Sequence, residues 1–357
     1  MRRLLAFLLC LLCALAGAGM PIAAPAPAGA AADSAPPLRG MGLGLFSKDP
    51  QYDYRRDLQE LKALGVNAIL LVVNWYSPDI RSNAIEPRPD HGAENSTISD
   101  EKLIQVIRAA HRQDMKVLLF PYLRFDRRGP KDWRGVLAPA DFSVWAKNYE
   151  RFILHYADLG KRHGVALLSV GSELGSMEEK TEFWKGLIAK VRSRFPGELL
   201  YSSNWDHYSY PTFWRELDYI AMTSYYPLSK KNDPEFPEML ATWQGLKKKI
   251  LAFKAQYPQK LIFTEVGYPS LDGGNVNPWN YFAKAPVDVA EQALCYLAFI
   301  EAWKNTPELA GVFWWVWFDP GGPKDPGFSP RGKPAEEILR KWYGGAGPTQ
   351  YSRQKTP

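Results

Sequence analysis

Residues 67–74, Asn-Ala-Ile-Leu-Leu-Val-Val-Asn, contain the uninterrupted apolar run Ile69–Val73. A strand with one wet face alternates apolar and polar residues, whereas a continuous apolar run is typical of a parallel strand covered on both faces. The following segment, 99–113, carries apolar residues at helical spacing, including Leu103 and Ile107. The stretch therefore predicts one strand-helix unit of a parallel sheet.

The same unit recurs along the chain from Arg39 onward. Strands are predicted at 41–46, 67–74, 116–122, 165–170, 199–203, 218–223, 260–266 and 311–317. Helices are predicted at 53–64, 99–113, 141–162, 179–195, 238–255, 288–304 and 334–343, with a short helical link near Phe213. Eight units in about 300 residues fit a single (β/α)8 TIM barrel. A doubly wound sheet is the alternative, but Gly42-Leu43-Gly44 is only a fragment of its glycine-rich fingerprint.

The N-terminal segment has the layout of an export signal. Arg2 and Arg3 precede an apolar run from Leu4 to Leu15, and alanines with A-x-A spacing follow. The run is shorter than the roughly 20 residues of a spanning helix, although an uncleaved anchor is the alternative. We expect a signal peptide at 1–18, a Pro/Ala-rich linker at 19–38, a catalytic domain at 39–343 and a flexible tail at 344–357. The mature protein is expected in the periplasm or outside the cell, without a membrane anchor.

Composition narrows the possible functions. Cys295 is the one cysteine outside the signal segment, which excludes an internal disulfide and a cysteine-based zinc or redox motif. Without Arg2 and Arg3, 42 basic residues stand against 38 acidic ones, dispersed along the chain, so nucleic acid is not an expected partner. The 13 Trp, 18 Tyr and 17 Phe are numerous enough to fill a large core and still supply flat rings for sugars. We expect no cofactor, no metal and no protein partner.

Two glutamates end apolar strands. Glu173 follows the strand at 165–170, and Glu265 lies inside the strand at 260–266. Barrel enzymes carry their chemistry at the C-terminal strand ends, and strands four and seven lie nearly opposite each other across the mouth. Either residue alone could be a structural ion-pair member. Together, as carboxylates about 5 Å apart, they suit double displacement at an anomeric carbon.

With these residues the chain resembles Glycoside Hydrolase Family 113, whose characterised members are β-1,4-mannanases. The resemblance covers about residues 39–343. It is carried by the motifs Val170-Gly171-Ser172-Glu173, Phe263-Thr264-Glu265-Val266-Gly267-Tyr268, Phe313-Trp314-Trp315-Val316-Trp317 and Phe328-Ser329-Pro330-Arg331-Gly332-Lys333-Pro334-Ala335. It implies a retaining endo-β-1,4-mannanase acting on a polysaccharide or oligosaccharide, with Glu173 as acid/base and Glu265 as nucleophile. Much of the superfamily has Asn before the acid/base, whereas this chain has Ser172.

Other strand-end residues are candidates for binding sugar. They are Asn74, Trp75, Arg124, Ser172, Asn204, Trp205, Asp206, Tyr225, Tyr226, Trp315 and Trp317. Tyr225 is expected to hydrogen-bond Glu265, with Tyr226 as the alternative. Trp315 and Trp317 alternate in direction with Trp314, and one of them is expected to form the floor of a sugar subsite.

Three alternative functions remain open. The first is hydrolysis of another β-glycan, such as glucan, xylan or a bacterial envelope polysaccharide. The second is a carbohydrate-binding barrel without catalysis, which would not need two facing carboxylates. The third is a metal-dependent deacetylase, which would need several His and Asp ligands at strand ends. Among the histidines only His207 lies at a predicted strand end, where we interpret it as a solvated loop residue.

Overall fold

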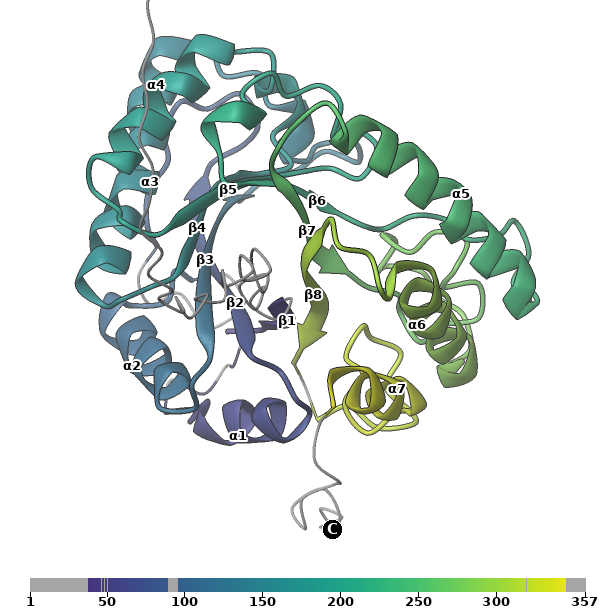
Figure 1. Cartoon of the computed structure of the whole chain (residues 1–357). Helices are drawn as coiled ribbons and strands as arrows, with labels where there is room; N and C mark the ends of the chain where they lie inside the picture. Colours follow the sequence, from purple (N-terminus) through teal and green to yellow (C-terminus); the bar gives the residue numbers. More distant parts are fainter. Residues whose placement is uncertain are drawn as a thin grey trace, which may run out of the picture. The chain divides into compact units, whose positions relative to one another are not determined.

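The computed structural model describes residues 38–45, 47, 49, 51–88, 96–318 and 320–344. Within these residues the strands pair in chain order into a closed parallel barrel, β1 to β8, and helices surround it (Figure 1). The predicted (β/α)8 barrel is confirmed. The predicted signal peptide, the linker up to residue 37 and the tail after Gly344 lie outside the described residues. No helix of the described part is long and apolar enough to cross a membrane.

Strands and helices alternate around the barrel. The strands are β1 Leu38–Leu43, β2 Ala68–Ser77, β3 Lys116–Phe125, β4 Leu167–Ser172, β5 Glu198–Ser203, β6 Tyr219–Thr223, β7 Lys260–Val266 and β8 Leu309–Trp317. The helices are α1 Arg55–Ala63, α2 Asp100–His111, α3 Phe142–Arg162, α4 Thr181–Arg192, α5 Phe236–Lys254, α6 Val289–Trp303 and α7 Pro334–Tyr343. Short 3-10 helices are η2 Arg134–Val136, η3 Gly175–Met177 and η4 Trp214–Glu216, and η4 alone links β5 to β6.

The strands are buried on both faces, as their composition predicts. All ten residues of β2 are buried. Leu70 and Val72 belong to a cluster inside the barrel, whereas Ile69 and Leu71 pack in the larger cluster between strands and helices. The inner cluster also contains Phe120 and similar apolar residues from the other strands. Side chains therefore fill the barrel as a solid core, and the site is left to the ends of the strands.

The first strand begins earlier than predicted, so the expectation of 41–46 is wrong by three residues. Leu38 pairs with Gly311 of β8, and Gly40 pairs with Ala68 of β2. A side chain at position 40 would collide with the ring of Phe313, because a Cβ there would lie 2.3 Å from it. The strand starts with polar and glycine residues, so a search for continuous apolar runs does not detect this pairing.

The segment after β8 joins the two ends of the barrel. Arg331 donates hydrogen bonds to Asp57 at 2.5 Å and to Glu60 through Nε at 2.9 Å, both on α1. Its guanidinium also lies 4.9 Å from the ring centre of Trp317 at the end of β8. Asp57 is 3% exposed and accepts a further hydrogen bond from Tyr52. Removing one partner from such a buried pair leaves an uncompensated charge.

We predict that Arg331→Met lowers the free energy of unfolding by roughly 2–4 kcal/mol, because Asp57 stays buried without its cation. Arg56→Met is the matched control, since Arg56 pairs with the same Glu60 from a side chain that is 68% exposed. Such an exposed pair is worth about 0.5 kcal/mol or less. Denaturant unfolding of both variants measures the difference, and equal losses would contradict a closing role for Arg331.

Candidate active site

Glu265 is a buried carboxylate at the C-terminal end of β7. Its side chain is held by Tyr225, whose hydroxyl donates to Oε2 at 2.6 Å, as the sequence predicts. The other oxygen, Oε1, is buried and has no hydrogen-bond partner among the described residues. Burial and then the charge of Glu173 raise the pKa of Glu265 to about 8, against the lowering effects of Arg134 and Tyr225. Glu265 therefore holds a proton far more tightly than an ordinary glutamate.

Glu173 directly follows β4 and faces the same space. Thr223, at the end of β6, donates to its Oε1 at 2.8 Å, and Arg134 contacts its Oε2. The residue has a φ of 52°, in the left-handed region that few non-glycine residues adopt. Because such backbone strain tends to gather at functional sites, the position of Glu173 is itself a reason to look for a function.

Arg134 brings a positive charge to the two glutamates. It lies in η2, on the loop between β3 and α3, and its guanidinium sits 3.6 Å from the ring centre of Tyr122. It also hydrogen-bonds the Tyr122 hydroxyl. The side chain is 14% exposed, so its charge is little screened by water. A cation in this position offsets part of the cost of burying the two carboxylates.

A further buried glutamate supports the strained turn at Glu173. Glu178 is 1% exposed and accepts hydrogen bonds from Tyr201 at 2.9 Å and Ser203 at 3.0 Å. Tyr201 in turn accepts the backbone N–H of Leu174 at 3.0 Å, which fixes the residue directly after Glu173. Burial is the main cause that raises the pKa of Glu178 to about 7. The backbone of the candidate catalytic residue therefore rests on a buried polar group.

Several predicted binding residues line the same mouth. Asn74 is 7% exposed, and its Oδ1 lacks a partner within the described residues, as does the Ser172 hydroxyl. Asn204 accepts from Thr223 at 3.3 Å and donates to Asp206 at 2.6 Å, which ties both to the Glu173 side of the site.

The inner face of the barrel supplies further predicted residues. Trp315 packs against the inner cluster, so its side chain lies on the inner face of the barrel, and its role as the floor of a sugar subsite stays a prediction. Arg124 lies two residues beyond Tyr122 on β3, hence on the same face of the strand, and its charge acts on Tyr122. The hydroxyl of Tyr226 donates to the carbonyl of Trp205 at 2.6 Å. Tyr226 therefore positions Trp205, while Tyr225 binds Glu265.

Two predicted binding residues lie elsewhere. Trp75 stacks on Phe152 of α3 with ring centres 5.0 Å apart, so its prediction as a sugar-binding residue is wrong. Trp317 is 1% exposed and packs in the outer cluster with Trp314. The expected alternation fails because the pairing of β1 with β8 jumps from Trp314 to Trp317. The extra residue turns Trp317 away from the mouth.

Sequence reasoning missed Arg134, Thr223 and Glu178. Arg134 comes from a 3-10 turn nine residues after β3, and no periodic pattern marks it. Thr223 ends β6, one residue before the positions that the sequence placed at the strand end. Its position at a strand end could have identified it as a candidate site residue. Glu178 precedes α4 in the run Met177-Glu178-Glu179-Lys180, where a surface charge is the ordinary interpretation.

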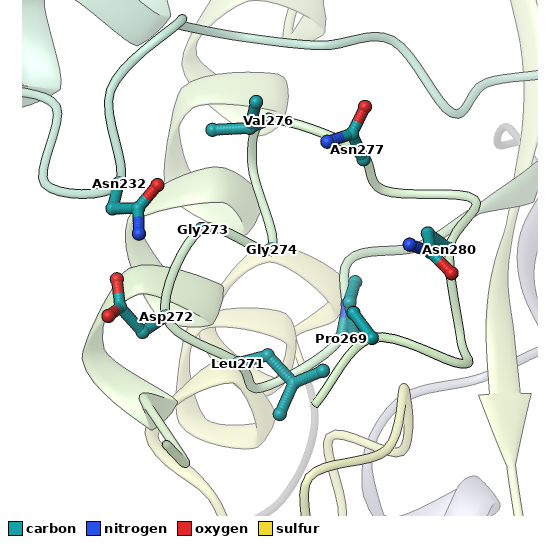
Figure 2. Close-up of a pocket in the computed structure, with 10 residues that line it drawn as sticks. Asn232, Pro269, Leu271, Asp272, Gly273, Gly274, Val276, Asn277 and Asn280 are labelled. Atoms are coloured by element: carbon teal, nitrogen blue, oxygen red, sulfur yellow. The ribbon is translucent and has the colours of Figure 1, made fainter. Parts of the chain in front are cut away.

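A separate pocket of about 180 Å³ opens in the loop after β7. Figure 2 shows Asn277 and Asn280 on one side of this pocket and Asn232 on the other. The pocket does not contain the two glutamates. Among the described residues no group of three or more His, Cys, Asp or Glu side chains is placed to hold a metal ion.

The sequence profile of Glycoside Hydrolase Family 113 matches residues 44–324. No curated protein matches the chain significantly. The GH113 β-mannanase AaManA from Alicyclobacillus acidocaldarius, solved in complex with ManMIm, superposes with a TM-score of 0.77 at 26% identity, over 86% of this chain and 97% of that one.

Two further solved structures share the fold. A GH113 β-1,4-mannanase superposes with a TM-score of 0.72 at 21% identity, over 86% of this chain and 99% of that one. A β-glucuronidase from Faecalibacterium prausnitzii superposes with a TM-score of 0.58 at 14% identity, over 86% of this chain and 49% of that one. Because the family profile spans most of the sequence, the chain belongs to Glycoside Hydrolase Family 113 and is a glycoside hydrolase.

Proposed function

We propose that this protein is a retaining endo-β-1,4-mannanase with Glu265 as nucleophile and Glu173 as acid/base. The observation that carries the proposal is the pair of buried carboxylates at the ends of β4 and β7, close enough for the charge of Glu173 to raise the pKa of Glu265. The choice of mannan is supported by the likeness to AaManA, a β-mannanase. Hydrolysis of glucan, xylan or an envelope polysaccharide is the alternative, because Ser172 alters the position next to the acid/base.

The geometry suits double displacement. In the first step, Oε1 of Glu265, which accepts no hydrogen bond from the described residues, attacks the anomeric carbon while Glu173 gives its proton to the leaving oxygen. In the second step, Glu173 takes a proton from water, and the resulting hydroxide displaces Glu265 from the sugar. Tyr225 holds the other Glu265 oxygen throughout and so orients the attack.

The first step needs an ionised Glu265 and a protonated Glu173. Burial and the charge of Glu173 raise the pKa of Glu265 to about 8, which opposes its ionisation, whereas Arg134 lowers that pKa. The Arg134 guanidinium therefore favours the nucleophilic form of Glu265.

Export is part of the proposal. The basic start, the short apolar run and the A-x-A spacing of residues 1–18 support a cleaved signal peptide. A periplasmic or extracellular location suits an enzyme whose substrate is a polymer too large to enter the cell. N-terminal sequencing of the protein recovered from culture fluid or periplasm tests this part.

The function is tested by incubating the protein with β-1,4-linked mannan, glucan and xylan oligosaccharides. We expect mannan oligosaccharides to be cleaved internally, and proton NMR in the first minutes to show the product in the β configuration. An α-anomer as first product would exclude double displacement. Cleavage of glucan or xylan in preference to mannan would leave the mechanism and overturn the substrate.

Glu265→Gln should abolish activity and stabilise the protein. The amide cannot attack, so kcat/KM should fall by at least about a thousandfold. The pKa of Glu265 rises from 4.5 in the unfolded chain to about 8, so the native state loses stability as pH rises through this window. The variant should therefore melt roughly 2–4 °C higher than the wild type at pH 8 and equally at pH 4.

Glu182→Gln is the control for this substitution, because Glu182 is 89% exposed on α4. It should leave both activity and the pH dependence of Tm as in the wild type. A Glu265→Gln variant that keeps hydrolysing mannan would remove Glu265 from the mechanism.

Arg134→Met should shift the pH profile of kcat/KM upward. Arg134 lowers the pKa of Glu265, so its loss raises that pKa and keeps Glu265 protonated to higher pH. The acidic limb, which reports the ionisation of the nucleophile, should move upward by about one pH unit or more. Arg134→Lys, which keeps the charge, should move it less. Arg127→Met is the control on the same loop, since Arg127 is 72% exposed, and an unshifted Arg134→Met profile would contradict the proposed effect of Arg134 on Glu265.

A further inference from the structure

Two buried polar atoms face each other behind the turn that carries Glu173. Oε2 of Glu178 and Nδ1 of His207 are both buried, and neither has a hydrogen-bond partner within the described residues. The two atoms lie 3.7 Å apart. This distance is somewhat longer than a hydrogen bond, whose upper limit is roughly 3.2 Å, and a small rotation of either side chain closes it. Because buried polar atoms are normally hydrogen-bonded, each is the natural partner of the other.

The imidazole ring of His207 is held against this turn by its surroundings. It stacks on Tyr210 with ring centres 4.6 Å apart and planes 18° apart. On the other side lies Gly175 of η3, where a Cβ would be 3.4 Å from Nδ1. The side chain is 39% exposed, but the exposed part is not Nδ1, which is buried. His207 therefore differs from the fully solvated loop residue that the sequence indicates.

Glu178 supports the turn through one oxygen only. Its Oε1 accepts hydrogen bonds from Tyr201 at 2.9 Å and from Ser203 at 3.0 Å. Tyr201 has a single hydroxyl proton, and its oxygen also accepts the backbone N–H of Leu174. The hydroxyl proton must therefore point to Oε1, and this bond forms only while Oε1 itself carries no proton.

Any proton on Glu178 has to lie on Oε2 if this support is to persist. Burial raises the pKa of Glu178 to about 7, and the charges of Glu173 and Asp206 act in the same direction. Below that pH the carboxyl group is mostly neutral. An imidazole nitrogen without a proton accepts a hydrogen bond, and one with a proton donates. Nδ1 of His207 therefore suits Oε2 in both forms of Glu178 and leaves Oε1 free for Tyr201.

The loop that carries His207 also reaches the Glu173 side chain. The backbone N–H of His207 donates to the carbonyl of Asn204 at 2.9 Å. Oδ1 of Asn204 lies 3.3 Å from the Thr223 hydroxyl, which donates to Oε1 of Glu173 at 2.8 Å. The loop after β5 thus contacts both the support behind the Glu173 backbone and the group that binds its carboxylate.

We propose that His207 is a positioning residue for Glu173, acting by binding Oε2 of Glu178 so that Oε1 stays free to hold Tyr201 and the turn. The inference rests on the proposed function, in which Glu173 gives its proton to the leaving oxygen. Glu173 has a φ of 52°, so its backbone depends on outside support. Proton transfer requires hydrogen-bond distance, and a turn that relaxes moves the carboxyl group away from the leaving oxygen.

The test uses two substrates that differ in their need for the proton. β-1,4-Mannotetraose loses a sugar alkoxide, which must be protonated, whereas 2,4-dinitrophenyl β-mannobioside loses a phenolate that leaves without a proton. His207→Phe keeps a ring on Tyr210 and removes Nδ1. Its kcat/KM on mannotetraose should fall roughly tenfold, while kcat/KM on the dinitrophenyl substrate should change by less than about twofold. His207→Gln, whose amide can bind Oε2, should recover part of the loss.

Two further variants sharpen the comparison. His163→Phe is the control, because His163 is a partly exposed histidine between α3 and β4, at the opposite end of the barrel from the site. It should keep the wild-type ratio between the two substrates. In a Glu178→Gln background, His207→Phe should cost less on mannotetraose than in the wild type, because an amide oxygen facing Tyr201 carries no proton.

Three outcomes would overturn the positioning role. Equal losses of His207→Phe on both substrates would assign the ring to packing alone, and thermal melting of the variant would show that loss of stability. An unchanged kcat/KM on mannotetraose would show that Nδ1 is not needed. A wild-type protein that cleaves neither substrate would refute the proposed function and this inference with it, and that result is distinct because it needs no variant.

Discussion

The contact between the Arg134 guanidinium and Glu173 is the interaction on which the site depends. Two carboxylates are buried at the mouth of a barrel whose interior is apolar, and the charge of Glu173 disfavours the charged form of Glu265. Arg134 lies on a short turn against the Tyr122 ring, and its charge offsets part of the cost of burying both carboxylates.

The fold supplies this arrangement at a cost to its own stability. Burial disfavours the charged form of Glu265, and Glu173 has a backbone conformation that non-glycine residues rarely adopt. Specific hydrogen bonds stabilise this conformation. Tyr201 accepts the backbone N–H of the residue after Glu173 and donates to Glu178. The closed strand ladder and the Arg331 contact between the two ends of the barrel provide the surplus stability that offsets such strain.

The architecture and the two glutamates could be predicted from the sequence because each depends on a short stretch of residues. Continuous apolar runs such as Ile69–Val73 indicate doubly covered strands, and a carboxylate at the end of such a run is conspicuous. Trp317 was misplaced because one irregular pairing in β8 reverses the alternation that periodicity assumes. Arg134 could not be predicted because its role depends on how the loop between β3 and α3 folds back toward the glutamates. Neither residue spacing nor composition indicates that loop conformation.

The loop after β7, which holds the separate pocket, has a consequence for how this barrel could diversify. An antiparallel bridge between Leu271 and Val287 brings the two ends of this long loop together, so the cost of changing the loop's length grows only slowly with the residues added. Most of the contacts that order the loop come from within it and from the first turn of α6. The segment between the bridge residues can therefore change in sequence and length during evolution. Such changes alter the surface of the loop and leave the strands and their two carboxylates unchanged.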